Sequence, residues 1–239
     1  MKVKEITLLL ATVSLLLSSY AKAGDNYIEL KNVESDNLDL TIEQVGANNT
    51  IQCYNDNSCW IKDSITIDLK QVNTSTYENT IEIWHLEDGG NTVRWGQGVS
   101  LNNKTSTTWI YDNDESGGHY SRLDIHGSNN TLVGYQQNAG GTNSGHIFTS
   151  LIFSDNNDIW VRQKNNGQKE LNLYTTSDGN EIDVIQKSNG GEHTANINLH
   201  GSYPTDISLI QRGQANQSYS LTQTCMTVGG CSISVTQGN

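Results

Sequence analysis

A seven-residue pattern of asparagine, alternating apolar residues and glutamine recurs along the chain and constrains its fold more than any other feature. In the copy Asn180–Gln186 (NEIDVIQ), the asparagine, Ile182, Val184 and the glutamine occupy alternate positions. Alternate residues of a β-strand point to the same side, so these four side chains are expected to share one face. Copies of the pattern, the last two with a substituted first residue, begin at Asn91, Asn130, Asn157, Asn180, Thr205 and Cys231.

The spacing of these copies indicates a solenoid. Successive copies begin 39, 27, 23, 25 and 26 residues apart, and self-similarity at such a period is typical of repeat architectures. A second alternating segment precedes most copies, at residues 121–125, 148–152, 170–174 and 195–199. The sequence therefore predicts an all-β fold, a β-solenoid with two short strands per rung and about eight or nine rungs. Residues 99–119 are irregular, and we interpret them as an insertion that lengthens the 39-residue step.

Asparagine and glutamine at fixed places in each rung predict ladders of stacked side-chain amides. Amides repeated at about 4.8 Å along the axis can each bond to the next, whereas a buried amide without a partner costs about 1–3 kcal/mol. The predicted ladder residues are Asn49, Asn91, Gln97, Asn130, Gln136, Asn157, Gln163, Asn180, Gln186, Gln211 and Gln237.

The N-terminus predicts export. Lys2 and Lys4 precede an apolar run, residues 8–17, and Ala21–Ala23 is a small-x-small cleavage site. This is the pattern of a secretory signal peptide, too short for a spanning helix. We therefore predict a signal peptide over 1–23, a leader or N-terminal cap over 24–37, a repeat domain over 38–239, and no transmembrane segment.

The charge of the mature chain argues against nucleic acid as a partner. Without residues 1–23, 11 basic and 25 acidic side chains remain, a balance of −14, and phosphates would be repelled. The six histidines (85, 119, 126, 146, 193, 200) show no metal-ligand spacing, and no order of catalytic residues is recognisable. His85 and His200 are expected to be surface or turn residues. The sequence predicts neither an enzyme nor a cofactor.

Two pairs of cysteines predict local disulfides in an exported protein. Cys53 and Cys59 enclose one short loop, and Cys225 and Cys231 enclose another. Closing such short loops stabilises by about 2 kcal/mol in the chain-entropy view. A zinc site is the alternative, but the spacing does not fit and no histidine pair accompanies it.

The repeats resemble those of the curlin family, the subunits of bacterial curli fibres. That family's Gln-x-Gly-x2-Asn segment is matched at Gln44–Asn49 (QVGANN) and Gln211–Asn216 (QRGQAN). The copies at 91, 130, 157 and 180 match its Asn-x5-Gln half. The resemblance implies an extracellular, amyloid-like subunit on a Gram-negative bacterium that contributes to adhesion and biofilm matrix. It implies self-association or assembly with other curli-type subunits, and an outer-membrane secretion or nucleation partner. Variable repeat lengths and four cysteines favour a minor, nucleating or accessory member.

Two other functions stay open: a monomeric surface adhesin with capped ends, and a secreted solenoid that binds or degrades polysaccharide. Three surface positions, Asp158, Glu181 and Asp206, are expected to stack on the outer face. They would bind divalent cations such as calcium or, the reading we favour, discourage sideways aggregation. Two outward aromatic residues, Tyr135 and Trp160, are candidates for contact with a sugar or a neighbouring fibre.

Overall fold

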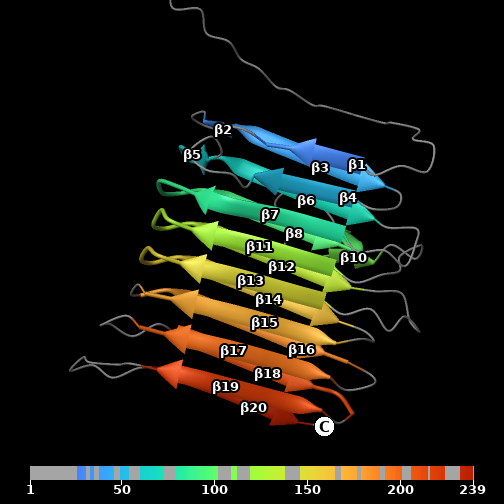
Figure 1. Ribbon diagram of the computed structural model, residues 1–239, viewed down its shortest axis with the longest axis vertical. Coiled ribbons are helices and arrows are strands. Elements are labelled where there is room, and N and C mark those ends of the chain that lie inside the picture. The colour runs from blue at the N-terminus through green and yellow to red at the C-terminus, as the bar shows by residue number, and fades with distance from the viewer. Residues whose placement is uncertain are drawn as a thin grey trace, which may run out of the picture.

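The computed structural model of the chain describes residues 26–30, 33–34, 38–45, 49–53, 60–72, 79–101, 109–111, 119–137, 146–164, 168–176, 179–188, 192–200, 206–214, 216–223 and 232–238. The regular structure within these ranges consists of β-strands only. Most strands belong to two parallel sheets that face each other across a narrow core (Figure 1).

The first sheet contains ten strands, eight of which are stacked in the order in which they occur in the chain. They are β1 (Asn26–Glu29), β4 (Asn49–Cys53), β7 (Asn79–Leu86), β11 (His119–Ile125), β13 (His146–Ile152), β15 (Lys169–Thr175), β17 (His193–Leu199) and β19 (Gln217–Gln223). Two short strands, β2 (Val33–Glu34) and β5 (Ile61–Lys62), pair with each other, and β5 also pairs with β7.

The second sheet also contains eight strands in chain order. They are β3 (Asp39–Val45), β6 (Thr66–Val72), β8 (Thr92–Gln97), β12 (Thr131–Gln137), β14 (Asp158–Lys164), β16 (Glu181–Lys187), β18 (Asp206–Arg212) and β20 (Ile233–Gly238).

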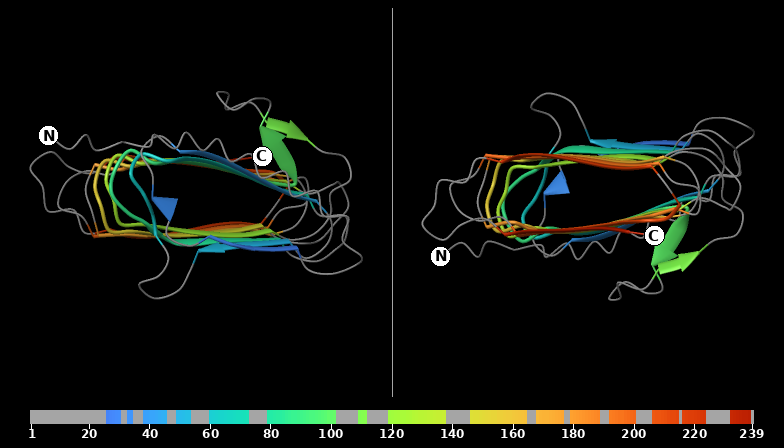
Figure 2. Two further views of the ribbon diagram at one scale, coloured as in Figure 1. Left: turned by 90° about the horizontal axis from the view of Figure 1, so that it is seen from above. Right: turned by 90° about the horizontal axis from the view of Figure 1, so that it is seen from below.

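The main strands alternate between the two sheets along the chain, so each turn of the backbone adds one parallel strand to each sheet. Viewed along the stack, the turns lie over one another as a flattened ring (Figure 2). This arrangement is a β-solenoid, and the predicted all-β class is confirmed. The first strand also takes part: β1, within the predicted leader or cap, pairs with β4.

Two short strands that follow β8 are not part of the coil. They are β9 (Val99–Leu101) and β10 (Trp109–Tyr111), which form an antiparallel pair separate from both main sheets. This hairpin lies within the 39-residue step between copies of the pattern. The next rung resumes in register, since Gln97 aligns with Gln136 despite the extra residues.

The turn from the first sheet to the second repeats one backbone conformation. The residue before the conserved asparagine has a positive φ in four successive turns: Gly90 (80°), Asn129 (59°), Asn156 (56°) and Gly179 (65°). Glycine and asparagine tolerate this left-handed conformation better than other residues. The dipeptides Gly-Asn and Asn-Asn at these places therefore encode the turn.

The core is built from columns of equivalent residues. Ile159, Ile182 and Ile207 are neighbours in successive rungs, and all three are buried. Val161 and Val184 continue a second column, where Trp95 and Gly134 occupy the equivalent places in earlier rungs. A single rung cannot bury its apolar face alone, so the stack itself makes the core continuous.

A large and a small residue share the space at this second column. Trp95 is fully buried, and its indole stacks on the ring of Phe148 with centroids 5.3 Å apart. A Cβ added to Gly134 would overlap the Trp95 ring. Glycine is therefore required here by the packing of the neighbouring rung, and its φ is not the reason.

We expect Gly134→Ala to lower the free energy of unfolding by about 1–3 kcal/mol, because overpacking a rigid core displaces its side chains. Chemical denaturation with urea measures the change. The matched control is Gly238→Ala in β20, where an added Cβ meets no atom within 4 Å. Equal stability of the two variants would contradict the packing argument.

Candidate functional site

The glutamines of the pattern form one continuous column from the first to the last rung of the second sheet. Each Nε2 donates a hydrogen bond to the Oε1 of the glutamine in the preceding rung, at 2.8–3.1 Å. All members except the last are buried. The column consists of Gln44, Gln71, Gln97, Gln136, Gln163, Gln186, Gln211 and Gln237.

Each glutamine except the last also bonds to the next strand of the first sheet. Gln163 Nε2 donates to the main-chain oxygen of Glu170 at 3.1 Å, and Gln211 Nε2 donates to that of Ser218 at 3.0 Å. The same amide group therefore joins successive rungs and holds the two sheets together at one end of the strands.

The asparagines of the pattern form a second column at the opposite turn. Asn91, Asn130 and Asn157 each donate from Nδ2 to the Oδ1 of the asparagine in the following rung, at 3.0–3.1 Å. The last acceptor is Asn180, and each Oδ1 also accepts a main-chain N–H of the preceding rung. Donors of the asparagine column point toward later rungs, whereas those of the glutamine column point toward earlier ones.

The structure brings together ten of the eleven predicted ladder residues, in two columns. Asn49 lies apart, at the start of β4 in the first sheet, where its Nδ2 donates to the main-chain oxygen of Gln44 at 3.4 Å. Sequence reasoning omitted Gln44 and Gln71 from the ladder. They could have been found, because each follows an alternating apolar segment.

We expect Gln163→Leu to lower the free energy of unfolding by about 2–4 kcal/mol. The substitution leaves Gln136 Oε1 without its donor and removes one hydrogen bond of Gln186 Nε2, which keeps its bond to the main-chain oxygen of Thr194. A buried unsatisfied polar group costs about 1–3 kcal/mol. The matched control is Gln137→Leu, one residue beyond Gln136 on the outer side of β12. The prediction fails if urea denaturation gives both variants the same stability.

Sequence reasoning missed a buried column of basic side chains. His119, His146, Lys169 and His193 align in successive rungs, each as the first residue of its strand, and each is at most 1% exposed. The rings of His119 and His146 stack with centroids 5.1 Å apart. The three histidines had seemed scattered; the available signal was that each opens the first-sheet strand before a copy of the pattern.

The surroundings of this column oppose protonation. Burial lowers the pKa of His146 well below its usual range, and the charges of His119 and Lys169 lower it further. Its Nε2–H donates to the main-chain oxygen of Lys164 at 2.9 Å, which is compatible with a neutral ring. Burial lowers the pKa of Lys169 to about 8, and the Glu192 carboxylate opposes that shift.

We expect stability to fall as the pH falls from 7 toward 5. The unfolded chain protonates His146 below about pH 6.5 while the folded chain keeps it neutral, which costs up to about 1.4 kcal/mol per pH unit. His146→Asn should reduce this pH dependence, measured by thermal unfolding across the range. His200→Asn, at an exposed ring, serves as control; a wild-type slope in His146→Asn would contradict the assignment.

The predicted outer-face residues lie on the second sheet. Asp158, Glu181 and Asp206 are in register and exposed. Trp160 is half-buried, and Tyr135 is covered by Arg162 and Lys164, whose charged groups lie 5.9 and 5.4 Å from its ring centroid. Within the described ranges, no three or more histidine, cysteine, aspartate or glutamate side chains are grouped to hold a metal ion.

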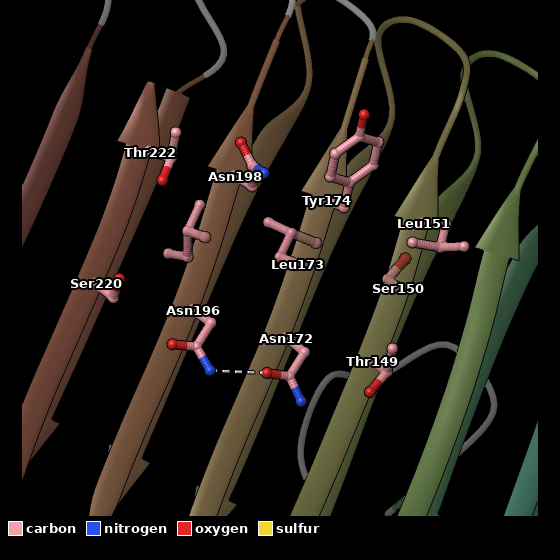
Figure 3. A pocket seen from close by; sticks show the side chains of 11 residues that line it. Thr149, Ser150, Leu151, Asn172, Leu173, Tyr174, Asn196, Asn198, Ser220 and Thr222 are labelled. Atoms are coloured by element: carbon pink, nitrogen blue, oxygen red, sulfur yellow. Dashed lines mark hydrogen bonds between the residues drawn. The ribbon is translucent and has the colours of Figure 1, made fainter. Parts of the chain in front are cut away.

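A shallow hollow lies on the outer face of the first sheet (Figure 3). Asn196 Nδ2 donates to Asn172 Oδ1 at 2.9 Å across neighbouring strands, and further along the same strands Tyr174 is the neighbour of Asn198. The lining consists of amide, hydroxyl and apolar side chains, without a carboxylate, imidazole, thiol or amine. Such a surface can donate and accept hydrogen bonds but offers no general acid or base near neutral pH.

The remaining predicted residues are placed only in part. Cys53 is fully buried at the end of β4, while Cys59, Cys225 and Cys231 lie outside the described residues, so both disulfides stay predictions. The predicted signal peptide also lies outside them. His85 stacks on His126 with ring centroids 5.1 Å apart. The described part of the chain contains no helix long and apolar enough to cross a membrane.

Both ends of the stack carry inward-facing apolar side chains that are only partly covered. Ile28, Leu38 and Leu40 pack against the core at the first rung. At the last rung the equivalent residues are Tyr219, Leu221, Ile233 and Val235. The strands β1 and β3 at one end, and β19 and β20 at the other, each have a neighbour on one side only within the main sheets.

Comparison with protein-family models, with curated protein sequences and with solved structures gives no match for this chain. The class defined by the fold is therefore that of an all-β solenoid with internal amide ladders, and its function is inferred from its own geometry.

Proposed function

We propose that this chain is an extracellular structural subunit, similar in role to curli subunits, whose copies join end to end by adding strands to the terminal rungs. The observation that supports the proposal most is the glutamine column, which runs to both ends of the stack with one polarity. The predicted signal peptide and the acidic, repeat-built sequence agree with this role. The protein would contribute to cell adhesion and biofilm matrix at a Gram-negative cell surface.

The polarity of the column favours head-to-tail joining. Gln237 Nε2 donates to Gln211, so the Oε1 of Gln237 faces away from the stack and is available as an acceptor. The first glutamine of a following copy, Gln44, would meet it with its Nε2 in the same sense as every internal bond. A joint between two identical ends would oppose two acceptors or two donors.

The terminal side chains also favour joining. An unpaired sheet edge is a template for strand addition, and most proteins protect it. Here Leu40 at one end and Leu221 and Val235 at the other are partly exposed apolar residues that a joined rung would bury. Full burial of such side chains contributes about 1.5–3 kcal/mol each. The variable repeats suit a minor, nucleating or accessory subunit assembled with curli-type partners.

We expect purified residues 24–239 to form filaments, detected by thioflavin-T kinetics and electron microscopy after seeding. Leu221→Lys with Val235→Lys should stop growth, because the joint would bury two charges. At substoichiometric amounts this variant should also slow the wild type, since its intact first rung can still cap a growing end. The matched control, Ser220→Lys with Ser234→Lys, places the same charges on exposed outer positions of the same strands.

Other outcomes separate the competing functions. Absence of wild-type filaments with and without reductant would reject end-to-end assembly and favour a monomeric adhesin. Retention of that monomer on insoluble polysaccharide would favour a glycan-binding solenoid. Filament growth by the Leu221→Lys, Val235→Lys variant at the wild-type rate would reject the terminal rungs as the joining surfaces.

A further inference from the structure

One outer surface of the second sheet separates positive from negative charge across its width. We call it the charged face and define it by the outward residues of β14, β16 and β18. One edge is the acidic column Asp158, Glu181 and Asp206, and the other is the basic column Lys164, Lys187 and Arg212. Between them lie Trp160, Asp183, Ser208, Arg162, Ile185 and Ile210.

In earlier rungs of the same sheet, the charged side chains are arranged differently. There, opposite charges are neighbours: Arg94 Nη2 lies 2.8 Å from Asp68 Oδ2, and Lys70 Nζ lies 3.0 Å from Glu43 Oε1. Each of these pairs is satisfied within the chain. The sheet can therefore place complementary charges in adjacent rungs, but it does not do so on the charged face.

Like charges are stacked on the charged face instead. Two unit charges of one sign about 5 Å apart repel by about 1 kcal/mol even in water. Within the described ranges, no ion pair joins Lys164, Lys187 or Arg212 to a carboxylate. Burial lowers the pKa of Lys187, and Lys164, Arg162 and Arg212 lower it further, which reflects this uncompensated positive charge. An external surface that places opposite charges against each column would offset the repulsion between the like charges within it.

We propose that the charged face binds the charged face of a second copy of this chain, with the two solenoid axes parallel and related by a two-fold axis along them. This rotation reverses the direction of the strands across the face. It leaves each rung level with the same rung of the partner along the solenoid axis. Asp158 then meets the partner's Lys164, and Glu181 and Asp206 meet their basic counterparts in the same way. Each residue of the acidic column therefore faces a basic residue of its own rung.

The central residues fit the same arrangement. The rotation brings Trp160 opposite the partner's Arg162, and an arginine over an indole is a favourable contact. Within one chain, Arg162 already lies 5.0 Å from the Trp160 ring centroid. Ile210 meets the partner's Ser208. If the two axes were antiparallel, acidic residues would meet acidic ones and basic residues basic ones, so the charges select the parallel pair.

The size of the surface predicts weak pairing of single molecules. Six residue steps along a strand span about 20 Å, and the three rungs lie about 5 Å apart, so the buried area falls in the range of transient interfaces. Copies that are also joined end to end would present many such surfaces together, and the contacts would reinforce one another. The pairing itself does not depend on the proposed end-to-end assembly.

Charge exchange tests the proposal by sedimentation velocity at low salt. The variant Lys164→Glu, Lys187→Glu, Arg212→Glu should stay monomeric, and so should Asp158→Lys, Glu181→Lys, Asp206→Lys. A mixture of these two should pair, because both edges become complementary. A variant that carries all six changes keeps the wild-type net charge and should pair with itself. All samples carry Leu221→Lys and Val235→Lys to prevent end-to-end growth, and circular dichroism checks their fold.

The salt dependence of pairing and the oligomeric state of each variant decide the outcome. Wild-type pairing should weaken at least about tenfold between 50 and 500 mM salt, since screening shortens the range of the charges. A wild-type protein that stays monomeric at about 1 mM and low salt would overturn the proposal. So would self-association of either triple variant at the wild-type strength, because that result would show attraction without complementary charges.

Discussion

The side-chain amide hydrogen bond between successive rungs is the interaction on which this structure depends. A buried amide needs a partner, and here the partner is the equivalent residue one rung away. This requirement fixes the strands as parallel and in register. The repeats differ in length by up to 16 residues between the 39- and 23-residue steps, yet the bonds at both, Gln136 to Gln97 and Gln186 to Gln163, are 2.8 Å long. Length variation is therefore confined to the turns, and the ladder restores the register after each one.

The two amide columns have different roles in the coil. The asparagine column stabilises a short turn of constant shape, in which Asn129 and Asn156 adopt the left-handed conformation. Its four members span the middle rungs, and the first acceptor, Asn91 Oδ1, is met by the main-chain N–H of Ile65 instead of another side chain. The glutamine column spans the variable turns and continues through every described rung of the second sheet. Only the glutamine column can therefore carry the register from one molecule into the next.

The sequence predicted the features that every copy of the pattern repeats. The predictions were incomplete where one residue type occurs in different places or where one place holds different residues. Alternating apolar residues that end in a glutamine are enough to predict the strands, the side chains that point inward and the amide ladders, because each copy repeats the same residue types. Asn49 has the right residue type but lies in the other sheet, since a single asparagine does not tell which turn it enters. The buried column of His119, His146, Lys169 and His193 was missed because the histidines were compared for metal-ligand spacing and not for their place at the start of each first-sheet strand. The strand β19 was not predicted because Tyr219 and Leu221 are its only apolar residues.

The two proposed contacts, end to end along the axis and side by side across it, use different kinds of interaction. Along the axis, the proposed joint uses neutral amides and apolar side chains, which respond little to ionic strength. Across the axis, the charged face offers only groups whose attraction is screened by salt. His146 and His193 add a third dependence: burial lowers the pKa of both, so their protonation in the unfolded chain weakens the fold itself in acid. If both proposals hold, salt would control whether filaments pair and pH would control whether the subunit persists, so one short repeat would specify two separately adjustable levels of assembly.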